Sequence, residues 1–300
     1  LRMVNTKTRD SRLIFGHRDI VTCCDVNPNN HLITGGKDGR IFLWKLSSNG
    51  EDSFPEIIIS KKYKGHVSYV ISVAIGQKTG NVFVSCGGDG LLKLWNIAKQ
   101  TCKTVKPHQK EINFCRINSN EKYVLTGSQD KQIILYSAKT LKIVRQIKGH
   151  GKGVWDGDFA PFELMFATCS SDQLVKVWDL KMILDLHKKN TRGVSTPESN
   201  GDRAPAKKAI SAEKKPKREL TEDEENRLLV SQVLSNHAGD SIADIIGKGA
   251  SSTALDIEKS ECLFTLEGHE SPAIRVKWVN MGLQLKSGDT EGVVRLRNYR

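Results

Sequence analysis

The alternation of hydrophobic and polar residues along the chain predicts short strands that occur in groups. Between residues 69 and 97, the runs YVISVAI, NVFVSCG and LLKLWNI alternate between apolar and polar or small residues, which is the periodicity of half-buried strands. The stretches GKDG at 36–39 and GGDG at 87–90 carry the residues that tight turns between paired strands require. The pattern therefore predicts an all-β chain of antiparallel sheets.

Four kinds of side chain recur in register with these strands. A histidine follows a small residue or proline in five places: His17, His66, His108, His150 and His269. An aromatic residue stands 27 to 29 positions later in four copies: Trp44, Trp95, Tyr136 and Trp178. Arg297 takes this position in the fifth copy. Ten positions before it stands a hydroxyl residue: Thr34, Ser85, Thr126, Thr168 and Ser287. Six positions before it stands an acid: Asp38, Asp89, Asp130, Asp172 and Glu291. The nearly constant spacing of these four residue types over five copies indicates a structural repeat.

The chemistry of the four residue types predicts a hydrogen-bonded chain within each repeat. The acid in the turn accepts from the backbone and from the imidazole, which bonds the hydroxyl, which in turn accepts from the indole N–H. Such a network satisfies every buried polar group, and each bond contributes roughly 0.5–1.5 kcal/mol. The histidines and acids are thereby interpreted as structural, rather than as metal ligands or acid–base pairs. The stretch DIIGKGASST at 244–253 lacks the spacing of a phosphate-binding loop. We expect no catalytic residue, no metal site and no cofactor.

These repeats resemble those of the WD-repeat β-propellers, over residues of about 11–180 and 261–300. The steps from His66 to His108 and from His108 to His150 are both 42 residues, which matches the family period of ~40–45. The resemblance implies four-stranded blades, of which five are visible. Either these five are part of a seven-bladed ring, or the flanking blades have been lost. Tyr136 is expected to donate through its hydroxyl where the family has tryptophan. A Glu291–Arg297 pair is expected to replace the ordinary network in the last blade.

The period divides the chain into three parts. Residues 1–180 are predicted to form blades 1–4, and residues 261–300 a final, incomplete blade. Between them, residues 181–260 are predicted to be a largely disordered basic insertion, with a short helix near 221–236 that begins at the capping box of Thr221 and Glu224. Its clustered cations are candidates for nuclear import or RNA contact, or form a solvated linker: Arg203, Lys207, Lys208, Lys214, Lys215, Lys217 and Arg218. Lys152 is a further candidate for RNA contact.

Composition narrows the class of protein and the compartment. The 300 residues carry a formal net charge of +12, which favours a polyanionic partner such as nucleic acid. The seven cysteines include no C-x-x-C pair, which favours reduced thiols in the cytosol or nucleus. No apolar run of the ~18 residues that span a membrane is present, and the first residues lack a secretory apolar core. A membrane partner is therefore not expected.

A closer resemblance lies in the third and fourth repeats. The segments HQKEIN at 108–113, LTGSQDK at 125–131 and GVWDGDFAP at 153–161 are similar to those of the transducin-β-like WD-repeat subunits of the eukaryotic small-subunit processome, within their second propeller. The long insertion and the absence of a helical C-terminal domain depart from that pattern.

This resemblance implies a non-catalytic scaffold in the nucleus and nucleolus, with no small-molecule substrate. The implied partners are other WD-repeat processome subunits, pre-rRNA and a box C/D small nucleolar ribonucleoprotein, contacted directly or indirectly. The alternative is a WD-repeat adaptor, such as a ubiquitin-ligase substrate receptor, a histone-tail reader or a signalling scaffold. The excess of Lys and Arg, 46 against 34 acids, disfavours capture of basic tails.

Overall fold

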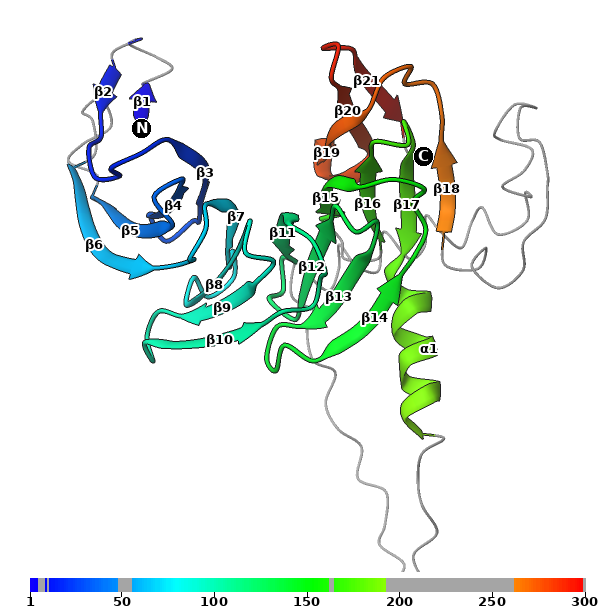
Figure 1. Ribbon diagram of the computed structural model, residues 1–300, viewed down its shortest axis with the longest axis horizontal. Helices are drawn as coiled ribbons and strands as arrows, with labels where there is room; N and C mark the ends of the chain where they lie inside the picture. The colour runs from blue at the N-terminus through cyan, green and yellow to red at the C-terminus, as the bar shows by residue number, and fades with distance from the viewer. Residues whose placement is uncertain (5–8, 10, 48–55, 162–164, 193–261, 299–300) are drawn as a thin grey trace, which may run out of the picture. The chain divides into compact units, whose positions relative to one another are not determined.

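The structure is a computed structural model. It describes residues 1–4, 9, 11–47, 56–161, 165–192 and 262–298, with only the backbone described along 187–192. The described residues are almost entirely β-structure, arranged in successive antiparallel sheets (Figure 1). The prediction of an all-β chain of repeated sheets is confirmed.

Four sheets contain four strands each, in chain order from the inner to the outer strand. The first sheet comprises β3 (Val21–Val26), β4 (His31–Gly36), β5 (Arg40–Ser47) and β6 (Glu56–Lys64). The second comprises β7 (Val70–Ile75), β8 (Val82–Gly87), β9 (Leu92–Asn96) and β10 (Thr101–Val105). The third comprises β11 (Ile112–Ile117), β12 (Tyr123–Ser128), β13 (Ile133–Ser137) and β14 (Ile143–Ile147). The fourth comprises β15 (Val154–Phe159), β16 (Met165–Ser170), β17 (Val175–Asp179) and β18 (Cys262–Leu266).

Smaller elements flank these sheets. The fifth sheet has three strands among the described residues, β19 (Ala273–Val279), β20 (Gln284–Asp289) and β21 (Val294–Asn298). A two-stranded sheet pairs β1 (Arg2–Val4) with β2 (Ser11–Leu13). A 3-10 turn, η2 (Asn280–Gly282), links β19 to β20.

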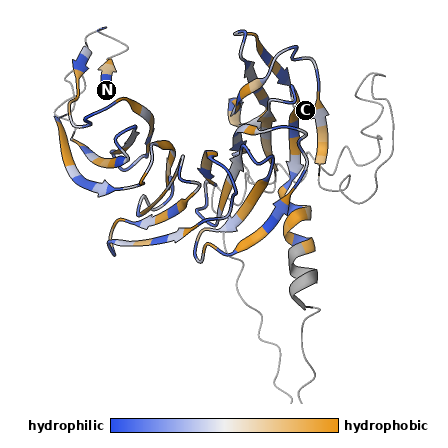
Figure 2. Ribbon diagram, in the orientation of Figure 1, coloured by the Kyte–Doolittle hydropathy of each residue, from blue (hydrophilic) through white to orange (hydrophobic). Residues whose placement is uncertain are grey.

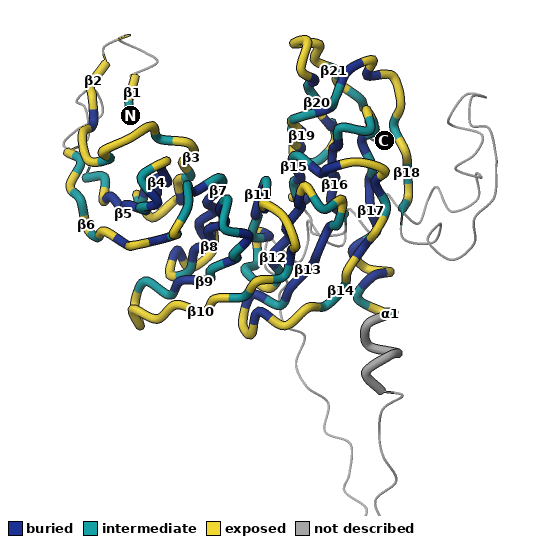
Figure 3. Tube along the Cα trace, viewed as in Figure 1, coloured by how far each residue is buried: buried dark blue, intermediate teal, exposed yellow. Residues whose placement is uncertain are grey.

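The hydrophobic core lies between consecutive sheets. The inner strands β3, β7, β11, β15 and β19 each contact the next one along the chain. Each pair of neighbouring sheets encloses its own apolar cluster, such as Phe114, Leu125 and Leu135 of the third sheet against Phe159 and Phe166 of the fourth. Apolar residues are accordingly frequent along the strands of these sheets (Figure 2). The strands β8, β12 and β16 are almost wholly buried, whereas β10 is exposed (Figure 3).

The helix α1 (Leu180–Arg192) occupies the first part of the segment that was predicted to be a disordered insertion from residue 181. Ile183 is fully buried in the cluster of the third and fourth sheets, and Leu184 packs against it. The Asp179 carboxylate accepts a hydrogen bond of 2.9 Å from the Met182 amide, as an N-cap does. The start of the predicted disorder is therefore wrong, because apolar residues at helical spacing anchor this turn.

The strand β18 corrects a second boundary. It was assigned with residues 261–300 to the final blade, but it pairs with β17 and completes the fourth sheet. The chain thus leaves the fourth sheet at α1 and returns to its outer edge at Cys262. The predicted helix near 221–236 lies outside the described residues. In the part of the chain that is described, no helix has the length and apolar character needed to span a membrane.

Candidate functional site

The repeated polar residues gather at one end of each sheet. In each copy the histidine stands just before the inner strand and the hydroxyl residue lies on the second strand. The acid stands at or just after the end of that strand, and the aromatic residue lies on the third strand. Antiparallel pairing brings these positions together, since the turn between the second and third strands and the loop that enters the inner strand share one end of the sheet.

The first sheet shows the full network. His17 Nδ1 lies 3.0 Å from Asp38 Oδ1, and His17 Nε2 lies 2.9 Å from Thr34 Oγ1. The Trp44 indole donates to the same hydroxyl oxygen at 2.9 Å. Asp38 also accepts from the backbone amides of Arg18 and Arg40, at 3.0 and 3.1 Å, so the carboxylate ties the loop to the turn.

The second and fourth sheets repeat this geometry. His66 contacts Asp89 at 2.9 Å and Ser85 at 2.9 Å, and Trp95 donates to Ser85 at 3.0 Å. In the fourth sheet, His150 contacts Asp172 at 2.9 Å and Thr168 at 2.8 Å, and Trp178 donates to Thr168 at 2.9 Å. The predicted residues of these three sheets are therefore within hydrogen-bond distance of one another.

The donors and acceptors fix the direction of each chain. An indole N–H can only donate and an ionised carboxylate can only accept. The hydroxyl therefore accepts from the indole and donates to Nε2, while Nδ1–H donates to the carboxylate, with a neutral imidazole between them. Burial lowers the pKa of His66, His108 and His150, although the neighbouring aspartates oppose the shift. Burial opposes the shift at Asp172, but hydrogen bonds from His150 and backbone amides lower its pKa to about 2.

The third sheet lacks the indole link. His108 contacts Asp130 at 3.0 Å and Thr126 at 2.9 Å. The Tyr136 side chain is buried near Thr126, and burial raises the pKa of its phenol. Its hydroxyl, however, makes no hydrogen bond of acceptable geometry with any described residue. The expectation that this hydroxyl replaces the indole donor is therefore wrong, although Thr126 lies near enough to offset part of the rise in the pKa of the phenol.

The fifth sheet uses a different acid from the predicted one. His269 Nδ1 contacts Asp289 Oδ2 at 2.8 Å and Nε2 contacts Ser287 at 2.8 Å, whereas Glu291 is exposed. Asp289 pairs with Ala273 as Gly36 pairs with Val21 in the first sheet. A side chain at Gly36 would point at His17 Nδ1, 2.6 Å from an added Cβ. An aspartate at this position therefore reaches the histidine directly, and the assignment to Glu291 is wrong.

Arg297 does not pair with Glu291 in the part of the chain that is described. Its guanidinium instead donates to Ser287 Oγ at 3.3 Å and to the Glu267 carbonyl at 2.5 Å. The guanidinium thus takes the place of an indole N–H on the hydroxyl residue. Burial lowers the pKa of Arg297.

The glycine before the histidine has a steric role in two copies. A Cβ at Gly149 would lie 2.1 Å from the Trp178 ring, and one at Gly16 would lie 2.6 Å from the Trp44 ring. Both distances are too short for any real contact, so the backbone must carry glycine where the indole folds over it. The third copy has Pro107 in place of this glycine, and in the same copy the aromatic residue is Tyr136, whose ring is smaller than an indole.

Two serines that the sequence reasoning missed strengthen the same end of the sheets. Ser128 donates to the Glu111 carbonyl at 2.7 Å and Ser170 to the Lys152 carbonyl at 3.2 Å. Each hydroxyl also accepts from the amide of the network aspartate, at 3.1 Å in both cases. The signal in the sequence was present, since both precede the network aspartate by two positions.

A charged pair on the inner strands was also missed. Arg116 on β11 contacts the buried Asp156 on β15 at 2.8 Å and donates to Ser72 on β7 at 3.2 Å. One guanidinium thus links three neighbouring sheets. Single-strand periodicity gives no signal for such a contact, because the partners are 40 residues apart.

The site has no group that is arranged for catalysis within the described residues. The network histidines and aspartates bond one another, and no three His, Cys, Asp or Glu side chains gather as a metal site there would require. Burial raises the pKa of the Cys86 and Cys169 thiols, which keeps both protonated and poorly nucleophilic. The candidates of the insertion, from Arg203 to Arg218, lie outside the described residues, while Lys152 is exposed beside the network of the fourth sheet.

Comparison with known proteins assigns the repeat to a family. The family model for the WD domain, G-beta repeat, matches residues 9–45, 58–96, 99–137 and 141–179, about half of the chain. The chain belongs to the WD40 family, and the β-propeller class predicted from its repeats is confirmed. Proteins of this class are generally non-catalytic scaffolds that bind other proteins.

Three relatives give the range of similarity. The chain is 29% identical over 192 residues to the guanine nucleotide-binding protein subunit beta of Arabidopsis thaliana, covering 59% of this chain and 49% of that protein. It is 31% identical over 174 residues to a guanine nucleotide-binding protein subunit beta-like protein of Encephalitozoon cuniculi, covering 55% and 51%. It is 26% identical over 172 residues to transducin beta-like protein 3 of Homo sapiens, covering 52% and 21%. The match thus spans about half, or less, of the length of these relatives.

Proposed function

We propose that this chain is a non-catalytic scaffold subunit of the small-subunit processome, which supports pre-rRNA processing and small ribosomal subunit assembly in the nucleolus. Its partners in this proposal are other WD-repeat subunits, pre-rRNA and a box C/D small nucleolar ribonucleoprotein. It takes no small-molecule substrate and no membrane partner.

The observation that carries the proposal is the similarity of the third and fourth repeats to the transducin-β-like branch. The segments 108–113, 125–131 and 153–161 carry it. Transducin beta-like protein 3 of Mus musculus is likewise 27% identical over 176 residues. Within these segments, a residue outside the shared network also makes contacts between sheets. Asn113 Nδ2 donates to the Val154 carbonyl at 2.7 Å and lies 3.4 Å from Gln129 Oε1, which joins the third sheet to the fourth.

Charge supports the same proposal. A formal net charge of +12 favours association with a polyanion through release of counterions. The cluster KKPKR at 214–218 supports nuclear entry. The internal use of the network His and Asp side chains supports a scaffold in place of an enzyme.

The decisive test is depletion of the protein followed by a blot for small-subunit rRNA precursors. We expect precursors to accumulate, and to return to normal when the intact chain is expressed again. Unchanged precursor levels after full depletion would reject the proposal. A fluorescent fusion should concentrate in the nucleolus, and a diffuse cytosolic signal would count equally against it.

The import signal has its own test. Replacement of Lys214, Lys215, Lys217 and Arg218 by Ala should shift the fusion toward the cytoplasm. A matched variant with Lys78, Lys99, Lys122 and Lys139 replaced by Ala removes the same charge from exposed positions of the sheets. If both variants localise as the unchanged chain does, the segment is a passive linker.

A signalling scaffold is the second candidate, and the similarity to G-protein beta subunits favours it. The two such relatives cover 59% and 55% of this chain. Cytosolic localisation together with unchanged rRNA precursors would select this candidate.

A further inference from the structure

The loops at the network end of the second, third and fourth sheets form a surface rich in exposed lysines. We call this surface the loop end. It consists of the loops that carry His66, His108 and His150 and the turns that carry Asp89, Asp130 and Asp172. Hydrogen bonds of the networks fix each loop to its turn. These hydrogen bonds therefore fix the position of the backbone that carries the lysines.

Six exposed lysines belong to the loop end, each one or two positions from a network residue: Lys64, Lys106, Lys110, Lys131, Lys148 and Lys152. None of the six makes an ion pair with another described residue. Half-buried Lys93 and Lys176 lie at the same end, over the Trp95 ring and against the Gly149 carbonyl. The carboxylates there are Glu111 and the three network aspartates, so eight lysines stand against four acids.

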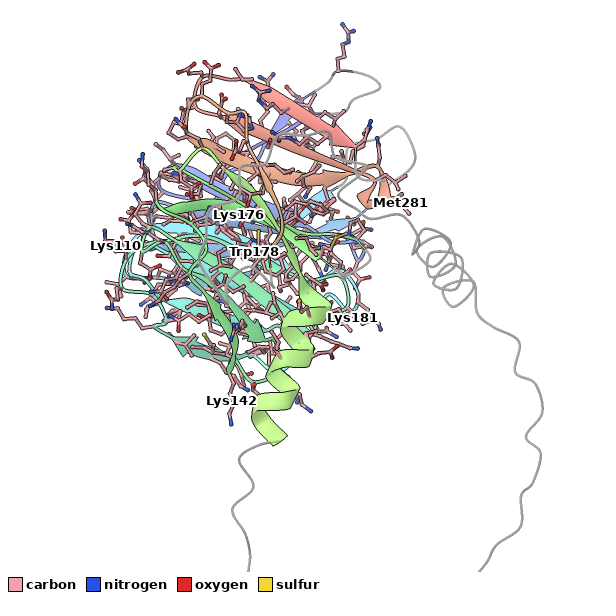
Figure 4. All side chains as sticks on the ribbon, turned by 90° about the vertical axis from the view of Figure 1, so that its right-hand side faces the viewer. Lys110, Lys142, Lys176, Trp178, Lys181 and Met281 are labelled. Carbon is pink, nitrogen blue, oxygen red and sulfur yellow. The ribbon has the colours of Figure 1, made fainter. Side chains whose placement is uncertain are left out.

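The loop end is continuous from sheet to sheet. The backbone carbonyl of Lys110 lies against the turn of the second sheet, 3.3 Å from a Cβ built at Gly90. The Tyr69 hydroxyl of the second sheet donates to Glu111 of the third at 2.7 Å. Figure 4 shows Lys110 on the opposite side of the sheets from Met281 and Lys181, which stand in the turns and connections of the other end. An extended ligand can therefore contact several of these lysines along one face.

Two aromatic side chains stand among the lysines. Tyr69 is half-buried beside Gly88, where a Cβ would lie 2.8 Å from the tyrosine ring. Trp155 is half-buried, and its indole donates to the Ser171 hydroxyl. The amide side chains of Gln109 and Gln173 are exposed nearby. Flat rings and amides between point charges suit unstacked bases and a phosphate backbone together.

We propose that the loop end binds single-stranded RNA, with the lysines on phosphates and Tyr69 and Trp155 against bases. The proposal deepens the function proposed above, since it supplies a direct contact with an RNA partner. The six exposed cations are all lysines, and none is an arginine that could bind a carboxylate with two parallel bonds. This favours a ligand with evenly spaced charges over an acidic protein segment.

The test is fluorescence anisotropy of the whole chain with a labelled oligouridine of about 20 nucleotides, over a series of salt concentrations. The triple variant K110Q/K131Q/K152Q removes three charges from the loop end while it keeps the aliphatic stems. The control K78Q/K99Q/K122Q removes three exposed lysines from the turns at the other end of the second and third sheets. For single strands each lost phosphate contact lowers the slope of log affinity against log salt by about 0.7, so a loss of roughly 2 is expected for the loop-end variant.

Tyr69→Ala tests stacking separately from charge. We expect affinity to fall roughly 5- to 150-fold, the range for one stacked base, with the salt slope unchanged. Thermal unfolding of each variant identifies a loss that comes from misfolding.

Three outcomes would overturn the proposal. They are absence of oligouridine binding by the unchanged chain, equal losses in the two triple variants, and binding of a polyglutamate peptide that the loop-end variant abolishes while RNA binding stays. The processome role fails separately, through unchanged rRNA precursors after depletion. If precursors accumulate while the loop-end variant binds RNA normally, only the loop-end proposal falls.

Discussion

At the scale of single residues, the network is a directional relay of hydrogen bonds that begins at an indole and ends at a carboxylate. Every member has a fixed donor or acceptor role, so a substitution matters according to which partner it leaves unpaired. Removing both groups of a bond costs little, whereas orphaning one buried group costs about 1–3 kcal/mol. The third and fifth sheets, which depart from the pattern, test this reasoning.

The buried hydroxyl of Tyr136 has no hydrogen-bond partner among the described residues, whereas the Thr126 hydroxyl bonds His108 Nε2 and the Ile134 carbonyl. Tyr136→Phe should therefore leave the free energy of unfolding unchanged or raise it by up to about 1 kcal/mol. Thr126→Val orphans His108 Nε2 and should lower it by about 1–3 kcal/mol. Urea denaturation of both variants measures the difference. A cost above about 1 kcal/mol for the phenylalanine variant would mean that the hydroxyl is bonded after all.

The fifth sheet provides a matched pair of acids. Asp289→Ala removes the acceptor of His269 and of two backbone amides, and should lower the free energy of unfolding by about 1–3 kcal/mol. Glu291→Ala changes an exposed side chain and should stay within about 0.5 kcal/mol. Equal effects in a denaturation experiment would contradict the assignment of Asp289.

At the scale of elements, a side chain of one sheet caps the backbone of the neighbouring sheet. Glu121, in the turn between β11 and β12, accepts from the amides of Lys78, Thr79 and Gly80 at 2.9, 2.7 and 3.3 Å. It also accepts from the Thr79 hydroxyl at 2.6 Å. One carboxylate thus holds the corresponding turn of the second sheet.

Glu121→Ala should lower the free energy of unfolding by about 1.5–3 kcal/mol, since bonds to a charged acceptor are lost. The Glu121→Gln variant keeps an acceptor oxygen and should lose less. Native-state hydrogen exchange should show faster exchange at residues 78–80 in the alanine variant. Unchanged exchange at these amides would show that the carboxylate does not hold the turn.

The helix α1 gives the second prediction at this scale. Ile183 is fully buried between the helix and the sheets, whereas Met182 is 37% exposed. Ile183→Ala should cost about 2–5 kcal/mol, because it opens a cavity in the shared cluster. Met182→Ala should stay within about 0.5 kcal/mol. Similar small costs in both variants, measured by thermal or chemical unfolding, would mean that the helix is not docked.

At the scale of the whole molecule, the repeated networks make stability depend on pH. Burial lowers the pKa of His66, His108 and His150, so the folded chain takes up protons at these sites less readily than the unfolded chain does. As pH falls below about 6.5, the ordinary value for histidine, the unfolded state gains protons first and stability decreases. The low pKa of Asp172, about 2, extends the loss below its ordinary value of about 4.

Urea midpoints measured between pH 7.5 and 5.5 should therefore decrease toward the acid side. The free energy of unfolding derived from them should fall by at most about 1.4 kcal/mol per pH unit for each of the three histidines. Asp25 and Asp158 act in the opposite sense, because burial raises the pKa of both carboxyls. A midpoint that is constant or rises on acidification would contradict the neutral-imidazole network.

The fold and most of the network followed from the sequence because both rest on local periodicity. Alternating apolar residues specify strands, and the fixed spacing from His17 to Trp44, and likewise in the later copies, places four polar groups at one end of a sheet. A repeat presents the same evidence several times, so one altered copy does not hide the pattern.

Tertiary structure alone decided the points where a residue acts through space. The choice of Asp289 over Glu291 depends on which Cβ points at His269, and the unpaired hydroxyl of Tyr136 depends on how far its ring reaches. The Arg116–Asp156 pair, the Glu121 contacts and the docking of α1 join residues that are distant in the sequence, and the order of residues along one strand does not encode such distances. The sequence determined the repeat and its chemistry, whereas the packing of one sheet against the next determined which copies use that chemistry in full.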